Sequence, residues 1–327
     1  MRVALAKGRI DHEAEATFAP ELARRPPFYF FSWILHDLER ACRSRGWNVD
    51  VLSVGKPTGQ RIPRPDVLVN LITEPLVCRR ALDRLATVVR TGDIRIVNTV
   101  DAVRRSSRTE LPNVIAASGT QGVRVPMTTR FSGDAAALER HIEAAGHRWP
   151  VLLRPAGTHS SKGLTKVDHP QGLRKVDMPH DLLVSEYIDF RSGDGLYRKY
   201  RMIYVDGTVF RRHVIAGPAW NITGMARVDM AARPETIIAE KAFLASGPGA
   251  LDRRIADLFR IVGLDFGVID FAVSDEDEIV VFELNGTFQI SGSIPAKRRE
   301  AWGYLEANNA AILGALVTLV ERHAGKA

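Results

Sequence analysis

The chain has 327 residues, of which 45% are hydrophobic and 25% are charged, and its formal net charge is +7 at pH 7. These fractions are typical of a soluble globular protein, and the length predicts two or three structural lobes. Basic residues occur singly or in pairs among acidic ones, whereas nucleic-acid-binding proteins usually cluster them. The charge therefore indicates an anionic partner such as a nucleotide or an acidic substrate, and DNA and RNA are not expected partners.

The two cysteines, Cys42 and Cys78, lie in largely apolar segments with helical patterns. Free buried thiols in a reducing compartment are the simplest interpretation. The apolar run at the N-terminus is too short for a signal peptide, and the longest apolar stretch, residues 310–320, is too short to span a bilayer. We therefore expect a soluble, cytoplasmic protein without membrane contact.

Short apolar strands alternate with helical segments in the first hundred residues. Strands are predicted at residues 1–6, 48–54, 65–72 and 94–99, and helices at 30–47 and 76–92. This alternation predicts a small parallel sheet with helices on its faces. Ligands bind beyond the carboxyl ends of strands in such sheets, a position that the sequence gives to Asn70, Thr73 and Glu74. A polar turn closed by Pro75 explains these residues equally well.

From Thr99 onward the pattern changes to antiparallel hairpins with flanking helices. One hairpin is predicted over residues 197–216 with its turn at Asp206-Gly207, and a second over residues 266–285 with an acidic turn. Helical segments over residues 233–263 are interrupted by Ser-Gly-Pro-Gly. The second part of the chain therefore differs in architecture from the first.

The last hairpin places three oxygen donors close together. Asp270 lies on its first strand and Glu283 on its second, and the turn falls about midway between them. Asn285 lies two residues after Glu283, on the same face of the strand. Carboxylates are costly to bury in an apolar sheet unless a cation compensates them. Mg²⁺ prefers such oxygen ligands together with the phosphates of a nucleotide, so these three residues are predicted metal ligands.

A polar loop follows the strand at residues 151–153. Arg154 ends that strand, and the loop over residues 156–163 combines glycines, hydroxyl side chains and one lysine. Backbone amides, hydroxyls and a cation suit a lid over phosphate groups. The loop lacks the spacing of a P-loop.

The stretches "VLLRPAGTHSSKG", "LLVSEYID" and "VIDF…VFELN" occur in the order and spacing of the ATP-grasp superfamily. The chain resembles its glutathione-synthetase-like and ribosomal-protein-modification-like branch of carboxylate–amine ligases. The resemblance implies an α/β fold in which two antiparallel lobes, each α+β, clamp ATP and Mg²⁺. It implies an N-terminal parallel α/β domain at residues 1–100, a central lobe at 101–183 and a C-terminal lobe with the metal site at 184–327.

The resemblance also implies nucleotide-binding residues. Arg154 and Arg108 would contact the phosphates, with Arg104 or Arg105 as alternatives to Arg108. The other candidates, which lie in the loop and in the hinge between the lobes, are Thr158, Ser160, Ser161, Lys162, Glu186, Tyr187, Ile188 and Asp189. The loop residues would cover the phosphates, and the hinge residues would line the adenine and the ribose, with Asp194 as an alternative to Asp189.

The same resemblance implies that Arg212 and Asn221 face the γ-phosphate and the acyl group, and that Arg201, the arginine that opens the hairpin strand in this branch, is also catalytic. For Arg198, Lys199 and Arg211, solvated strand residues are the better interpretation. The chain departs from the family pattern in having arginine at position 154, where lysine is more usual, and fewer glycines in the loop. His159 and His213 lie near the proposed site segments, and we interpret both as hydrogen-bonding or structural residues.

The resemblance implies an ADP-forming ligase that joins a carboxylate to an amine through an acyl phosphate. The expected substrates are an amino acid, a small peptide or a peptide tail, and a homodimer is the expected oligomer. An ATP-binding protein without ligase activity, with a regulatory role or as a partner subunit, is the alternative.

Overall fold

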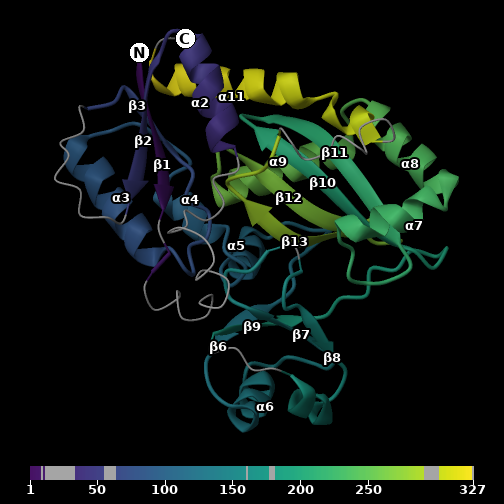
Figure 1. Cartoon of the computed structure of the whole chain (residues 1–327). Coiled ribbons are helices and arrows are strands. Elements are labelled where there is room, and N and C mark those ends of the chain that lie inside the picture. Colours follow the sequence, from purple (N-terminus) through teal and green to yellow (C-terminus); the bar gives the residue numbers. More distant parts are fainter. Residues whose placement is uncertain are drawn as a thin grey trace.

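A computed structural model describes residues 1–8, 10–11, 34–54, 64–159, 161–176, 181–290 and 302–325 of the chain. These residues form three sheets, each of which belongs to a separate lobe (Figure 1). The second lobe in chain order projects away from the other two, which lie side by side and share α11 (Asn309–His323). The predicted combination of a parallel α/β domain with antiparallel lobes is confirmed.

The N-terminal lobe contains a parallel sheet of strand order β2-β1-β3-β4. Its elements are β1 (Arg2–Gly8), α2 (Leu35–Ser44), β2 (Asn48–Val54), β3 (Val67–Asn70), α3 (Arg79–Gly92) and β4 (Ile96–Val97). Alternate residues of β1 face opposite sides, so that Ala4 and Ala6 pack with α3 while Val3 and Leu5 pack with α2. Residues 30–33 of the predicted first helix lie outside the described residues.

Both cysteines are buried free thiols, as expected. Cys42 lies on the inner face of α2, and burial raises the pKa of its thiol to about 12. Cys78 precedes α3, and its pKa is raised by burial and then by the nearby carboxylates of Glu74 and Asp11. Neither thiol is therefore suited to act as a nucleophile at neutral pH.

The central lobe is an antiparallel sheet of strand order β6-β9-β7-β8. Its elements are β6 (Thr128–Phe131), α6 (Ala135–Ala144), β7 (Val151–Pro155), β8 (Thr165–Val167), η1 (Pro170–Lys175) and β9 (Leu182–Glu186). Leu153 and Val184 pack against Leu138 and Ile142 of α6. The opposite face of the sheet, which carries Arg154, is therefore free to line a binding site.

The C-terminal lobe has a five-stranded sheet of order β11-β10-β12-β13-β5. Its strands are β5 (Val123–Arg124), β10 (Tyr197–Val205), β11 (Thr208–Gly217), β12 (Phe266–Val273) and β13 (Ile279–Asn285). Both predicted hairpins are present, and the first turns at Asp206-Gly207, where each residue has a positive φ. β5 joins β13 in a parallel pair, although it precedes the whole central lobe in the sequence.

The elements that immediately precede the central lobe in the sequence pack with the C-terminal lobe. The short helices α4 (Val100–Arg105) and α5 (Leu111–Ser118) pack with α9 (Ala250–Val262) in one core, and β5 belongs to the C-terminal sheet. These elements therefore pack with the C-terminal sheet, and the first strand of the central sheet, β6, begins at Thr128. The last strand of that sheet ends at Glu186, close to the predicted boundary at 183.

Helices cover the two faces of the C-terminal sheet unequally. On one face, Phe271 and Tyr204 pack with α9, and α8 (Pro234–Ala245) lies beside β11 with Phe243 in the same core. The short η2 (Gly224–Ala226) and α7 (Arg227–Ala231) also contact β11, but Met230 of α7 packs with Ala272 on the opposite face. On the other face, α11 and the preceding η4 (Gly303–Glu306) cover only part of the sheet (Figure 1). The remaining part of that face is turned toward the central lobe.

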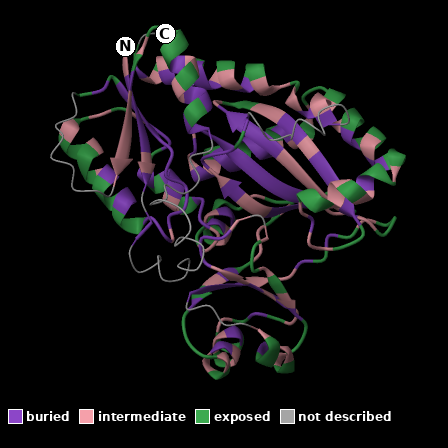
Figure 2. Cartoon of the chain, in the orientation of Figure 1, coloured by how far each residue is buried: buried purple, intermediate pink, exposed green. Residues whose placement is uncertain are grey.

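Residues Gly303–His323 form a run that is long and apolar enough, by length and composition alone, to cross a membrane. In the fold, α11 buries side chains against both the N-terminal and the C-terminal sheets (Figure 2), and these are Ile312, Leu316, Val317, Leu319 and Val320. The helix therefore packs as a core helix that joins two lobes.

Candidate functional site

A cavity of about 400 Å³ lies between the open faces of the central and C-terminal sheets. Leu152 and Arg154 of β7 line one side, and Lys199, Arg201 and Asp270 of the C-terminal sheet line the other. This volume is in the range of small-molecule sites in proteins. The two sheets thus provide opposite walls of a single binding site.

Asp270 and Glu283 lie directly opposite each other on β12 and β13. A β-bulge follows Asp270, and Asn285 lies two residues beyond Glu283, where its side-chain amide donates a hydrogen bond to Glu283. All three residues line the cavity, and Asp270 is only 6% exposed. The predicted juxtaposition of the three oxygen donors is therefore present, and it is buried and not on a solvated face.

Cationic side chains compensate both buried carboxylates. Arg201 donates Nε to Oδ1 of Asp270 at 2.5 Å and Nη2 to Oδ2 at 2.7 Å, and Lys199 lies 3.7 Å from Oδ2. Arg108 forms an ion pair of 2.8 Å with Oε2 of Glu283. Burial by itself raises the pKa of each carboxyl, but these cations outweigh burial and hold both pKa values below their ordinary range. Both groups are therefore ionised at neutral pH.

Arg154 adds a fourth cation to the cavity wall. Its guanidinium donates a hydrogen bond to the backbone oxygen of Thr158, which holds the start of the loop after β7. Burial, followed by the charge of Arg108, lowers the pKa of Arg154 to about 9. The side chain remains charged at neutral pH, so four cations surround the carboxylate pair, and the site is suited to a polyanion.

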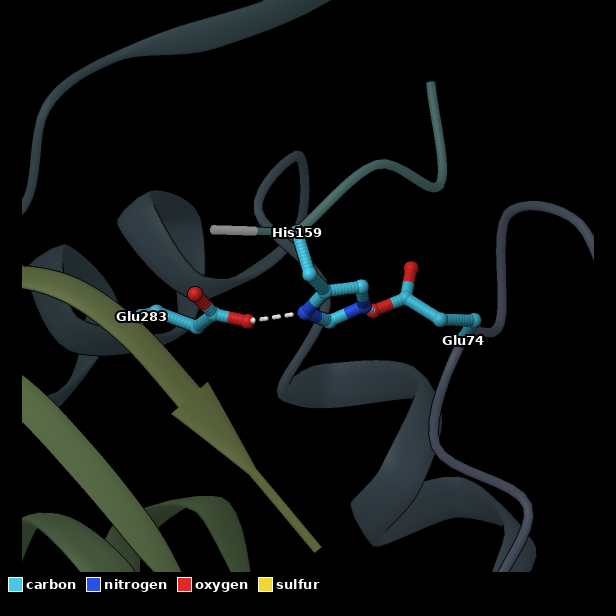
Figure 3. A group of neighbouring side chains, drawn as sticks. All are labelled: Glu74, His159 and Glu283. Atoms are coloured by element: carbon cyan, nitrogen blue, oxygen red, sulfur yellow. Dashed lines mark ion pairs between the residues drawn. The ribbon is translucent and has the colours of Figure 1, made fainter. Parts of the chain in front are cut away.

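His159 connects the three lobes at the edge of this site (Figure 3). The ring lies between two carboxylates, with Nε2 at 2.6 Å from Oε1 of Glu74 and Nδ1 at 3.0 Å from Oε1 of Glu283. Burial lowers the pKa of His159, but the two carboxylates more than reverse that effect and raise it to about 9. The imidazole is therefore cationic at neutral pH, in a hydrogen-bonding role that the sequence predicted only in general terms.

The donor set of the cavity fits Mg²⁺ bound to a nucleotide. Two carboxylates and an amide oxygen lie on adjacent strands, and cationic side chains already occupy the carboxylate oxygens. Such pairing indicates that this position favours positive charge, and hard oxygen donors are the ligands that Mg²⁺ prefers. Asp270, Glu283 and Asn285 are therefore the residues that would hold the ion.

Most of the predicted site residues lie in the cavity wall. They are Arg108, Arg154, Ser161, Glu186, Tyr187, Ile188, Arg201, Asn221, Asp270, Glu283 and Asn285. Of the three arginines that the sequence left open, the exposed Arg104 pairs with Asp83, and Arg105 donates to the backbone oxygen of Val262. Arg108 is the one whose side chain faces the cavity.

Three of the other predicted residues do not line the cavity, and a fourth, Ser160, is not described. Thr158 donates its hydroxyl to the backbone oxygen of Pro155, Lys162 is exposed on the loop, and neither belongs to the cavity wall. Asp189 accepts a hydrogen bond from the backbone of Arg191 outside the wall, and Ser160 lies outside the described residues. The wall on the loop side therefore comes from His159, Ser161 and Leu164.

Arg212 does not face the cavity, in contrast to the expectation from sequence. The β10–β11 pairing shifts register beside Arg201, so that His213 lies opposite Arg201 and Arg211 opposite Met202. The shift gives His213 the position in the cavity wall that Arg212 was expected to take. The guanidinium of Arg212 instead donates to the backbone oxygens of Leu305 and Ile290 and to Oδ1 of Asn309.

Sequence reasoning missed Lys199, which was expected on a solvated surface. It lies two residues before Arg201 on β10, and both side chains face the cavity. The alternation of side chains along a strand was the available signal, because it places residues 199 and 201 on one face. For Arg198 and Arg211 the structure gives roles outside the cavity, since Arg198 pairs with Asp194 and Arg211 with Asp252.

The end of β9 provides a mixed polar and aromatic corner of the cavity. Glu186 pairs with Arg124, and the Tyr187 ring meets Trp220 edge to face at 5.9 Å, with Nζ of Lys166 at 4.2 Å from the Tyr187 ring centre. Tyr187 and Trp220 both line the cavity. Flat aromatic surfaces beside exposed backbone groups are suited to a planar ring such as a purine.

Comparisons with known proteins agree with this architecture. No family model matches the chain. A stretch of 49 residues is 43% identical to formate-dependent phosphoribosylglycinamide formyltransferase of Synechococcus sp. (strain WH7803), and it spans 15% of this chain and 13% of that protein.

Solved structures match over nearly the whole chain. D-alanine–D-alanine ligase from Bacillus anthracis, complexed with ATP, has a TM-score of 0.54 and 12% identity, and the match covers 100% of this chain and 99% of that one. The Coxiella burnetii D-alanine–D-alanine ligase gives 0.52 and 15%, with coverage of 100% and 97%. The ATP-grasp ligase PsnB, complexed with a minimal precursor, Mg and ADP, gives 0.51 and 12%, with 96% of each chain covered. The chain therefore has the ATP-grasp fold, as its motifs predicted.

Proposed function

We propose that this protein is an ATP-dependent carboxylate–amine ligase that forms ADP and an amide bond. The observation that carries the proposal is the Asp270–Glu283 pair, which faces a cavity of about 400 Å³ among four arginine and lysine side chains and the imidazolium of His159. A carboxylate pair suits a metal ion, and the surrounding cations suit the phosphates that such an ion accompanies. The ATP-grasp fold and its ligase neighbours support the same conclusion.

The cavity residues divide the task between nucleotide binding and phosphoryl transfer. Arg108 and Arg154 would bind the phosphates from the side of the central lobe, and Tyr187 and Ile188 would hold the adenine at the hinge. Arg201 and Asn221 would face the γ-phosphate and the acyl group. Bound Mg²⁺ would neutralise charge that develops on the transferred phosphoryl group.

The proposed reaction has two steps. An oxygen of the carboxylate substrate attacks the γ-phosphorus of ATP, and the bond from that phosphorus to the bridging oxygen breaks to release ADP. The nitrogen of the amine substrate then attacks the carbonyl carbon of the acyl phosphate, and phosphate leaves while the nitrogen loses a proton. The loop after β7 would exclude water, which otherwise hydrolyses the acyl phosphate.

The proposed substrates are an amino acid, a small peptide or the tail of a peptide. Support comes from the neighbours, which include D-alanine–D-alanine ligases and the ATP-grasp ligase PsnB in complex with a minimal precursor. A soluble cytoplasmic enzyme that acts as a homodimer, without nucleic acid or membrane partners, completes the proposal. Light scattering on the purified protein tests the oligomeric state.

The experiment that tests this function is ADP release from MgATP in the presence of pools of amino acids and short acidic peptides. Glu283→Gln is the blank, because it removes one charge from the proposed metal site and keeps the size of the side chain. Glu276→Gln is the matched control, since Glu276 is exposed in the turn of the same hairpin. We expect acceptor-dependent ADP release from the parent and from Glu276→Gln, and none from Glu283→Gln.

Two other outcomes would change the conclusion. Equal activity in the parent and Glu283→Gln would refute the metal assignment. Tight MgATP binding without turnover in any pool would favour the alternative function, that of an ATP-binding regulatory protein or partner subunit.

A further inference from the structure

The ring of His159, in the loop after β7, forms ion pairs with side chains of two other lobes. Glu74 follows β3 of the N-terminal sheet, Glu283 lies on β13 of the C-terminal sheet, and His159 belongs to the central lobe (Figure 3). The His159 and Glu74 side chains are 9% and 6% exposed. The loop is therefore held against both neighbours by one buried residue.

A metal ion bound by these three residues would explain the cluster less well. The nearest oxygen of Glu74 lies 2.6 Å from Nε2 of His159. A metal at its usual distance of about 2.0–2.2 Å from both atoms would hold them roughly 3 Å or more apart. The observed distance instead matches a direct ion pair between an imidazolium and a carboxylate.

Binding of a magnesium nucleotide would affect the two ion pairs of His159 differently. Glu283 is a proposed Mg²⁺ ligand, and its two oxygens are occupied by His159 and Arg108. The bond from His159 to Glu283 therefore competes with metal binding. Glu74 lies outside the proposed metal site, so its ion pair with His159 can persist throughout.

We propose that His159 acts as a latch. Its ion pair with Glu74 of the N-terminal domain holds the loop after β7 closed over the nucleotide. The inference rests on the proposed nucleotide site. It assigns Glu74 and His159 as positioning residues, which act through the loop and not on the reacting atoms. It also assigns a function to Glu74, one of the polar residues that the sequence placed at the carboxyl end of the N-terminal sheet.

The latch predicts that nucleotide leaves faster when either residue is changed. The probe is the fluorescent nucleotide mant-ADP with Mg²⁺, and its dissociation rate is measured by stopped-flow displacement with excess ADP. A charge-assisted contact of ordinary strength corresponds to about a tenfold faster dissociation in His159→Ala. Glu74→Gln should give a similar increase, and the double variant should add little, because both changes break one contact.

Hydrogen exchange of the loop gives a second readout that needs no nucleotide. A peptide covering residues 151–167 should exchange faster in His159→Ala and in Glu74→Gln than in the parent. His169→Ala is the matched control, since His169 is exposed in the same lobe and contacts Gln171 outside the cavity wall. It should leave both the dissociation rate and the loop exchange unchanged.

The outcomes separate the latch from the nucleotide site. Normal mant-ADP binding with unchanged dissociation and unchanged loop exchange in both variants would overturn the latch and leave the nucleotide site standing. No mant-ADP binding to the parent protein would overturn the nucleotide site, and the latch with it. Circular dichroism melting curves identify a variant that loses its fold, and Glu74→Gln, which keeps the size of the side chain, is the milder of the two.

Discussion

At the scale of single residues, each carboxylate in the cavity is neutralised by a neighbouring cationic side chain. Asp270 and Glu283 would each be costly to bury alone, and each has a guanidinium partner, Arg201 and Arg108. These partners are long enough to turn toward phosphate groups when a metal ion takes over the carboxylates. The same arginines therefore stabilise the carboxylates here and, under the proposed function, would bind the phosphates of the nucleotide.

Asp270→Asn should weaken binding of magnesium nucleotide by at least about tenfold, because the site loses one of its two carboxylate ligands. Isothermal titration calorimetry with ADP and Mg²⁺ measures the change, and Asp275→Asn in the exposed turn of the same hairpin is the control. Removal of Mg²⁺ with EDTA should abolish the difference between parent and variant. A difference that persists in EDTA would show that Asp270 acts otherwise than through the metal.

At the scale of elements, the β12–β13 hairpin sets the relative positions of Asp270, Glu283 and Asn285, the proposed metal ligands. Gly267 lies where an added Cβ would be 2.4 Å from the backbone oxygen of Asn285 and 2.7 Å from the Phe259 ring. Neither neighbour can move without displacing β13 or α9. The close approach of the strands beside Asn285 therefore depends on a residue without a side chain.

Gly267→Ala should lower the free energy of unfolding by about 2 kcal/mol or more, since overpacking a core forces its backbone to shift. Gly314→Ala is the opposite control. Gly314 is exposed on α11 with nothing within 4 Å of its added Cβ, and the change should stabilise the protein by about 0.5–1 kcal/mol. Urea unfolding measures both variants, and equal effects would contradict the steric argument.

The central lobe contains a pH-sensitive contact. Thr129 on β6 shares its hydroxyl with the rings of His141 and His147, each at 2.9 Å. Burial, and then the proximity of His141, lowers the pKa of His147 below its ordinary 6.5. The folded lobe therefore favours the neutral ring, while the unfolded chain gains a proton as the pH falls below about 6.5.

Stability should accordingly be full above pH 6.5 and should fall as the pH decreases from that value toward the lower folded-state pKa. His147→Gln should lose less stability than the parent between pH 7.5 and pH 5.5 in urea unfolding. An equal loss in both proteins would show that other groups account for the acid sensitivity.

At the scale of the whole molecule, one buried asparagine joins the N-terminal and C-terminal lobes. Asn98 follows β4 with a φ of 58°, and its Oδ1 accepts hydrogen bonds from the backbone of Asp265 at 2.8 Å and of Phe266 at 3.2 Å. Its Nδ2 donates to the backbone oxygen of Phe266 at 3.0 Å. These hydrogen bonds thus attach the start of β12, the strand that carries Asp270, to the first lobe.

Asn98→Gly should lower the free energy of unfolding by about 2–4 kcal/mol, because it leaves buried backbone groups at the start of β12 without partners. Glycine tolerates the positive φ, so the loss reports on the side chain. Asp277→Gly, at an exposed turn residue with a φ of 61°, should stay within about 1 kcal/mol of the parent. Chemical unfolding of both proteins gives the comparison.

The sequence by itself determined most of the elements and the juxtaposition of the three oxygen donors on the last hairpin. Alternating apolar residues and short turns act locally, so both hairpins and the juxtaposition of Asp270, Glu283 and Asn285 follow from the pattern of a single segment. The order of the sequence motifs along the chain likewise predicted the ATP-grasp fold. These features depend on contacts between neighbours in the sequence.

The tertiary structure decided which cations and which loop residues reach the cavity. A register shift beside Arg201 places His213 in the wall and turns Arg212 toward η4 and α11, and no local pattern marks that shift. Helix packing selects Arg108 over its neighbours, and three lobes must assemble before Glu74 and His159 can meet. The positions of these side chains depend on contacts between segments that are far apart in the sequence, and those contacts form only when the whole chain has folded.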